Sequence, residues 1–561
     1  MTSPTAPPSL TAAPDFPSLA DRATGTYNSK AYAWAQHWGD TGGPEVEALA
    51  ENAYTNAVAA NEAATTASSA QSAASNAATT ASGHATTASN AATTASGHAT
   101  TAGTAATTAS AAATTASGHA TTASNASTQA QASAASAQAI VLGVSTGMPS
   151  IRPSFLADFA NSRAIDPRIT ITRPSTAFRV NQFGLPEQVA SGVGRIDFSP
   201  VALNCRGLLI EESRANLLTY SEQFDNGAWT KTRATVSANA AIAPDGTTTA
   251  DKLIEDTTAS NSHFVTQNYA ATNTTLSGSF FVKSAERSKC RIEISNFLNH
   301  AAAVDFDLTN GSFVVSTAGA TDYTNTQGSI VNAGNGWWRI SITATKGSAN
   351  SNNFLSLSVR NDAGNTIYTG DGTSGLYVWR AKLEAGSFPT SPDQTVASTV
   401  TRAADSATVT GTSFSSWYRQ DEGSVIVTAR SAPGVGSVDQ HVFSLTDSGG
   451  TNRITLYRNT SRFAVLVIDV GGVTQATLTS VATWADNTVA KIGVSFKAGS
   501  FALSLDGAAA VTAASGSVPT VDRLVLGNTV AGTRAFNGWI ERFGFFPKQI
   551  SNSELVAGAT Q

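Results

Sequence analysis

A seven-residue repeat extends from Ala50 to Ile140 and limits the possible folds of this stretch more than any other pattern in the sequence. The segment SGHATTA begins at Ser82, Ser96 and Ser117, so its copies lie 14 and 21 residues apart and keep one phase. Across the thirteen heptads, alanine occupies every d position and all but two a positions. A strict apolar heptad repeat predicts helices that supercoil around one another.

The same repeat offers little to stabilise such a coil or to choose its partners. Each alanine methyl group buries about one CH₂ equivalent, roughly 0.8 kcal/mol at most. Only Glu51 and Glu62 carry a formal charge between Ala50 and Ile140, so ion pairs at e and g positions cannot set the number of helices. An Ala/Thr/Ser tract can also be a disordered linker. The unbroken phase favours the coiled coil over that alternative.

An aromatic stretch precedes the repeat. The segment AYAWAQHW contains Tyr32, Trp34 and Trp38, and helical spacing places Trp34 over Trp38. Aromatic side chains outside a predicted core indicate a docking patch. A local cap on the coil would explain them equally well.

Beyond Ile151 the helical periodicity gives way to alternation of apolar and polar residues, which predicts strands. A hairpin is expected where Ile492, Val494 and Phe496 lead through Ala-Gly-Ser to Phe501 and Leu503. We therefore expect a fold class of a long N-terminal α-helical coiled coil followed by all-β domains, which are β-sandwiches in an elongated chain. The predicted parts are an N-terminal segment at 1–45, the coiled coil at 46–142, a small β-rich connector at 143–215, and β-sandwiches at 216–405 and 406–561.

Composition and charge argue against several classes of partner. The formal net charge of -5 provides no basic surface for nucleic acid. The N-terminal residues lack the charged and apolar regions of a signal peptide, and no run of about 18 apolar residues predicts a membrane span. The two cysteines, Cys205 and Cys290, fit either one disulfide bond or two buried thiols.

Motifs that resemble catalytic or ligand sites are better explained as a chance match at 143–147 and as turns at the other two positions. The GVSTG segment at 143–147 matches GxSxG but follows the predicted coil instead of a strand. The GDGTSG segment at 370–375 precedes a strand, so it offers no helix N-terminus to a pyrophosphate. The segment from Asp305 to Gly311 lacks the spacing and the final glutamate of a calcium loop. We therefore expect no enzyme, no metal site and no cofactor.

Several phrases resemble one known family. The stretch around Leu156 to Leu218 contains DFANSRAIDPRITITRP and leads into GLLIEESRANLLTYSEQF, phrases similar to the middle of bacteriophage tail-fibre proteins. The segments GWWRISI, GLYVWRAKLEAGSFPTS and TVTRAAD resemble a carbohydrate-binding-like jelly roll. Residues 420–561, with KIGVSFKAGSFALSLDG and FNGWIERFGFFPKQISNSEL, resemble a laminin-G or concanavalin A-like lectin domain.

The resemblance implies a homotrimeric tail fibre in the virion. Its residues 1–45 would attach to other tail or baseplate proteins, with Tyr32, Trp34 and Trp38 as candidate docking residues. Its C-terminal sandwich would bind a host surface polysaccharide without membrane insertion. Aromatic side chains suit sugar stacking, so the candidate ligand-binding residues are those at four positions outside the clearest alternating core: Trp417, Tyr418, Tyr457 and Trp484. The alternatives are a structural connector that docks other tail proteins and a depolymerase.

Overall fold

The chain forms two compact units, Met1–Ala135 and Ser136–Gln561, in a computed structural model. The structure describes a defined set of residues: 18–25, 27–36, 80, 83, 109–110, 112–113, 115–130, 151–269, 275–295, 301–318, 323–347, 353–432 and 438–560. Among these residues, no helix has the length and apolar character that a membrane span requires.

The first unit contributes short helices. They are α1 (Leu19–Thr24) and α2 (Tyr27–Gln36), and residues 115–130 are also helical. In this last stretch the heptad alanines Ala116, Ala120 and Ala123 are exposed. The hydroxyl groups of Thr121 and Thr122 donate to the carbonyl oxygens four residues earlier, a pattern that slightly weakens a helix.

The prediction of a long N-terminal coiled coil is wrong. The described chain consists mainly of β-sheet, the five helices with assigned bounds span 4 to 10 residues, and no long coiled coil is present in the part of the chain that the structure describes. Most of the predicted range 46–142 lies outside the described residues. The heptad pattern specified a register, but alanine methyl groups bury too little apolar area to hold helices together on their own.

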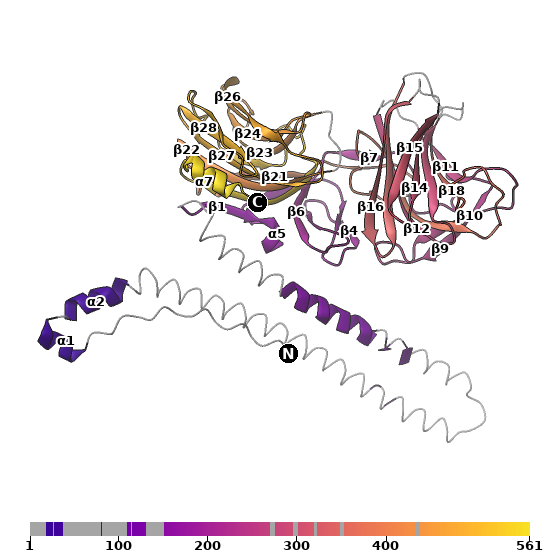
Figure 1. Ribbon diagram of the computed structural model, residues 1–561, viewed down its shortest axis with the longest axis horizontal. Coiled ribbons are helices and arrows are strands. Elements are labelled where there is room, and N and C mark those ends of the chain that lie inside the picture. The colour runs from indigo at the N-terminus through magenta and orange to yellow at the C-terminus, as the bar shows by residue number, and fades with distance from the viewer. Residues whose placement is uncertain are drawn as a thin grey trace. The chain divides into compact units, whose positions relative to one another are not determined.

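The C-terminal sandwich consists of two antiparallel sheets (Figure 1). Its eight-stranded sheet has the order β29-β28-β27-β22-β31-β6-β5, with β1 also paired to β31. The strands of this sheet are β1 (Phe155–Asp158), β5 (Ile196–Phe198), β6 (Cys205–Ile210), β22 (Glu422–Ser431), β27 (Val489–Lys497), β28 (Ser500–Leu505), β29 (Val511–Ala513) and β31 (Gly538–Phe546).

The opposing seven-stranded sheet has the order β2-β21-β30-β23-β24-β25-β26. Its strands are β2 (Thr170–Thr172), β21 (Ser406–Thr410), β23 (Gln440–Thr446), β24 (Arg453–Arg458), β25 (Phe463–Val470), β26 (Val473–Thr483) and β30 (Arg523–Leu526). Both sheets thus include strands from residues 143–215, the range that the sequence predicts as a small β-rich connector. Phe155, Ile196 and Leu208 accordingly belong to the same hydrophobic core as Val425 and Leu466.

The predicted hairpin is present in this sandwich. Val494 pairs with Leu503 and Phe496 with Phe501 across β27 and β28, and Gly499 turns the chain with a φ of 70°. Two short helices, α5 (Phe159–Ser162) and α6 (Thr412–Ser415), cover parts of the core. A third, α7 (Asn552–Gly558), lies against β27 and β28.

A second sandwich is formed by the chain between β8 and β19. One sheet has the order β16-β17-β12-β19-β10-β9, with strands β9 (Ala234–Ala241), β10 (Ala250–Glu255), β12 (Thr275–Ser284), β16 (Tyr323–Gly334), β17 (Trp337–Lys346) and β19 (Gly375–Ala385). The other has the order β15-β14-β13-β18-β11-β8, with strands β8 (Thr230–Thr232), β11 (His263–Tyr269), β13 (Lys289–Ser295), β14 (Ala301–Asp307), β15 (Ser312–Ala318) and β18 (Asn353–Arg360). Cys290 lies in its core, and Cys205 and Cys290 are both free thiols.

A buried ion cluster lies where the chain passes between the two sandwiches. We define it as Arg173, Arg195, Glu211, Arg402 and Asp405, whose side chains are at most 9% exposed. Arg195 pairs with Glu211 at 2.6 Å and also with Asp405, which accepts from Arg173 at 2.9 Å. Two small ladders flank the cluster: β7 (Arg214–Asn216) with β20 (Val400–Arg402), and β3 (Ala177–Val180) with β4 (Pro186–Val189).

Candidate functional site

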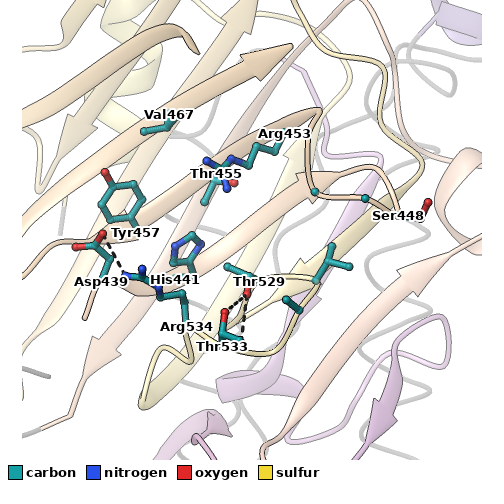
Figure 2. Close-up of a pocket in the computed structure, with 14 residues that line it drawn as sticks. Asp439, His441, Ser448, Arg453, Thr455, Tyr457, Val467, Thr529, Thr533 and Arg534 are labelled. Atoms are coloured by element: carbon teal, nitrogen blue, oxygen red, sulfur yellow. Dashed lines mark hydrogen bonds and ion pairs between the residues drawn. The ribbon is translucent and has the colours of Figure 1, made fainter. Parts of the chain in front are cut away.

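A cavity of about 580 Å³ opens on the outer face of the seven-stranded sheet (Figure 2). Its floor consists of side chains from β23, β24 and β25, and the loops at 448–450 and 529–534 form its rim. This volume lies within the range of about 300 to 1,000 Å³ that is typical of small-molecule sites.

Successive side chains of β24 point to opposite faces of the sheet, which explains why polar groups line the floor of the cavity. Ile454 and Leu456 point into the core, so Arg453, Thr455 and Tyr457 project from the opposite face. The sheet is antiparallel here, and Tyr457 of β24 pairs with His441 of β23.

Two side chains fix the rim loops. The carboxylate of Asp447 accepts hydrogen bonds from the backbone N–H of Thr451 at 3.0 Å and from the Asn452 amide at 2.8 Å, which closes the loop between β23 and β24. Asn528, only 1% exposed, accepts from the backbone N–H groups of Thr529 at 2.9 Å and Arg534 at 3.1 Å. Both loops therefore hold their side chains in defined positions beside the cavity.

An aromatic pair forms the centre of the floor. The rings of His441 and Tyr457 stack with centroids 5.3 Å apart and planes 18° apart. Burial, together with the charges of Arg453 and Arg534, lowers the pKa of His441 to about 3, so its imidazole is neutral at physiological pH. His441 is 7% exposed, and its Nδ1 atom has no hydrogen-bond partner within the described structure.

Two arginines and one acid bring charge to the cavity. The Nε–H of Arg453 donates to Asp469 at 2.6 Å, and Asp469 also accepts from the Thr474 hydroxyl at 2.7 Å. Arg534 lies 3.7 Å from Asp439, a distance longer than a hydrogen bond. The cavity thus combines flat rings, hydroxyl groups and guanidinium groups.

The structure places the four candidate ligand-binding residues in different environments. Tyr457 lines the cavity and is half-buried. Trp417 and Trp484 are 5% and 2% exposed and pack in the core. Tyr418 packs against that core and stacks on Phe414 at 4.6 Å. The fold therefore does not bring the four residues together.

The candidate docking residues belong to the first unit. Tyr32 and Trp34 are within α2, and Trp38 lies outside the described residues.

The other cavity residues carry no pattern in the sequence that marks them as a site. His441 had no neighbouring motif, and Arg534 and Asp439 come from loops whose positions depend on strand pairing. One signal was available for Arg453 and Thr455, because they share the outward phase of β24 with Tyr457.

A second cavity, of about 520 Å³, lies on the sandwich formed by β8 to β19. Its arginines already have strong partners. Arg291 donates to Asp305 at 2.6 and 2.9 Å and pairs with Glu293 at 3.2 Å, and Arg360 also pairs with Asp305. No group of three or more His, Cys, Asp or Glu side chains among the described residues is arranged to hold a metal ion.

Comparison with known proteins gives only distant similarities. No protein-family model matches the chain, and no curated protein matches it in sequence. Among solved structures, the Ruminococcus gnavus IT-sialidase CBM40 bound to alpha2,3 sialyllactose is 18% identical, covers 25% of this chain and 84% of its own, and has a TM-score of 0.23. The mouse laminin alpha1 chain domains LG4-5 are 12% identical, with coverage of 51% and 85% and a TM-score of 0.17. A SAP-like pentraxin from Limulus polyphemus is 11% identical, with coverage of 25% and 70% and a TM-score of 0.21. Scores of this size support no functional inference, and the sandwich architecture rests on the strand pairing itself.

Proposed function

We propose that this protein binds glycans without catalysis and that the cavity on the seven-stranded sheet is its binding site. The observation that carries the proposal is the His441–Tyr457 ring pair on the floor of a cavity whose rim supplies hydroxyl and guanidinium groups.

Sugar chemistry matches this combination. A pyranose ring has an apolar face of C–H groups, which packs on aromatic side chains, and a perimeter of hydroxyl groups, which need hydrogen-bond partners. Tyr457 offers an aromatic surface, while Thr529 and Thr533 offer hydroxyl groups from the rim.

The setting that we propose is a bacteriophage tail fibre, located in the virion tail and attached to a host surface polysaccharide. This part rests on the sequence resemblance of 156–218 to the middle of tail-fibre proteins and of 420–561 to a laminin-G or concanavalin A-like lectin domain. It includes a homotrimer and an N-terminal contact with other tail proteins. Several linked copies would raise the avidity of a weak sugar site by about 10²- to 10⁴-fold where the copies engage together.

A structural connector and a depolymerase are the competing functions. A connector would use a broad apolar surface instead of a cavity with rings and hydrogen-bonding groups. A depolymerase would release new reducing ends from the polysaccharide that it binds.

The test is a glycan array probed with the full chain, with Tyr457→Ala, and with Phe183→Ala as a control for an exposed aromatic residue outside the cavity. We expect Tyr457→Ala to lose the bound glycans and Phe183→Ala to retain them. Unchanged binding by Tyr457→Ala would reject the cavity as the site. A reducing-end assay on the bound glycan is expected to show no release, and steady release would reject a role without catalysis.

A further inference from the structure

The two guanidinium groups beside the cavity differ in how they are bonded. Arg453 is held by its 2.6 Å hydrogen bond to Asp469, a carboxylate that is only 5% exposed. Arg534 has Asp439 as its partner at 3.7 Å, and both side chains reach solvent, with 43% and 35% exposed. Arg453 thus commits its Nε–H to a buried carboxylate, whereas Arg534 has no carboxylate within hydrogen-bond distance among the described residues.

The backbone of Arg534 is nevertheless fixed. Its N–H donates to Asn528 at 3.1 Å, and its carbonyl oxygen accepts from the N–H of His441 at 3.2 Å. The backbone of Arg534 therefore lies directly beside His441 in the floor of the cavity. Figure 2 shows the Arg534 side chain extending toward Asp439. A guanidinium group with a fixed base and open donors is prepared to bind an anion.

The charged groups that line the cavity are two guanidinium groups and one carboxylate, that of Asp439. Asp469, which is not a lining residue, balances Arg453, so Arg534 is the cation with the weaker partner. His441 adds no charge because burial and the two arginines lower its pKa to about 3.

We infer that the cavity selects sugars that carry a carboxylate, such as hexuronic acids, and that Arg534 is the residue that determines this selectivity. The inference rests on the proposed glycan binding. The sugar carboxylate accepts two hydrogen bonds from the Arg534 guanidinium in place of the long contact with Asp439. The pyranose ring then packs on Tyr457.

The arginines of the second cavity provide an internal contrast. Arg291 and Arg360 share Asp305, and Arg291 also contacts Glu293, so an incoming carboxylate would have to displace close ion pairs. The long Arg534–Asp439 contact is exposed and costs little to break.

The experiment compares oligomers of galacturonic, glucuronic and mannuronic acid with their methyl esters, which keep the shape and remove the charge. Binding to the full chain is measured by calorimetry for the wild type, for Arg534→Met and for Arg462→Met, whose exposed arginine is not among the cavity-lining residues. We expect the wild type to bind at least one acid about tenfold more tightly than its ester, in line with a charge-assisted hydrogen bond. Arg534→Met should remove that difference, and Arg462→Met should retain it.

Equal affinity of the wild type for each acid and its ester would overturn the inference, as would selectivity that survives in Arg534→Met. Failure of the three acids to bind would also count against it. If neutral glycans bind through Tyr457 while charge has no effect, the proposed function remains and only the carboxylate selectivity fails. Thermal melting of each variant separates loss of binding from loss of fold.

Discussion

The arginines of the buried ion cluster and those of the cavity illustrate two uses of the same side chain. Arg173, Arg195 and Arg402 have no exposed side-chain surface and pair with carboxylates that are themselves buried. Arg453 and Arg534 are 40% and 43% exposed. The first group connects segments that are distant in sequence, and the second faces solvent beside the cavity.

The difference follows from the cost of removing charge from water. A buried guanidinium group without a partner is strongly unfavourable, so each arginine of the cluster requires a carboxylate. Burial opposes ionisation of Glu211, yet Arg402 and Arg195 outweigh that effect and hold its pKa below the usual range. An exposed arginine has water as an alternative partner, which leaves Arg534 available to a ligand.

The largest effect is expected from Arg195→Met. The substitution removes the cation that lies closest to both Glu211 and Asp405 and leaves these carboxylates buried, which should lower the free energy of unfolding by about 3 to 5 kcal/mol. Arg534→Met is the matched control, and its exposed ion pair should contribute less than about 1 kcal/mol. Urea unfolding monitored by tryptophan fluorescence measures both. Similar losses for the two variants would contradict the distinction between the groups.

The next effect is smaller and is a dependence of the free energy of unfolding on pH, which His441 causes. Burial disfavours the charged ring of His441 and lowers its pKa in the folded chain from the usual 6.5 to about 3. Between these two values the unfolded chain binds the proton and the folded chain does not. The contribution of His441 to the free energy of unfolding is therefore fully present above pH 6.5. It falls with decreasing pH by up to about 1.4 kcal/mol per pH unit.

The measurement is the free energy of unfolding at pH 6.5 and pH 5.0 for the wild type and for His441→Gln. We expect the wild type to lose about 2 kcal/mol more than the variant over this interval. The interval lies above the range in which ordinary carboxylates take up protons, so Glu211 contributes little to the difference. Equal losses in the two proteins would show that His441 is charged in the fold.

Much of the β architecture was predictable because alternation reports which face of a strand is buried. The hairpin of Val494 and Leu503 follows directly from its pattern. The partner of a strand is a different matter, since period-two alternation is the same for every antiparallel neighbour. The pairing of Phe155 with Phe545, which joins 143–215 to the C-terminal sandwich, therefore could not be predicted.

The residues of the candidate site were likewise predictable only in part. Tyr457 was a candidate because it is an aromatic residue outside the alternating core, but Trp417 and Trp484 matched that description as well. Their burial depends on tertiary packing, which local sequence does not report. Arg534 comes close to His441 only because β30 pairs with β23, so its role required the structure.

A moderate effect on the cavity is expected from Asn528→Ala. The substitution removes the acceptor for the N–H groups of Thr529 and Arg534, which should cost about 1 to 3 kcal/mol of stability and loosen the rim. Hydrogen exchange should become faster in residues 529–534 and stay unchanged at 448–450. Asn459→Ala is the control for the loss of a turn asparagine, because Asn459 holds the turn that directly follows β24. Unaltered exchange at 529–534 would mean that the rim is held by other contacts.

The smallest effect is expected from Asp439→Asn, and it tests whether Arg534 is truly available. Removing the charge of Asp439 frees the guanidinium group from a weak competitor, so the affinity for a carboxylated sugar should rise about two- to fivefold at low salt, the range of an exposed ion pair. The gain should shrink at 1 M salt, where the screening length falls to about 3 Å. Asp522→Asn removes another exposed acid, paired with Arg523, and should leave binding unchanged. A loss of affinity in Asp439→Asn would instead mean that Asp439 accepts hydrogen bonds from sugar hydroxyls and that the acid and the arginine bind the ligand together.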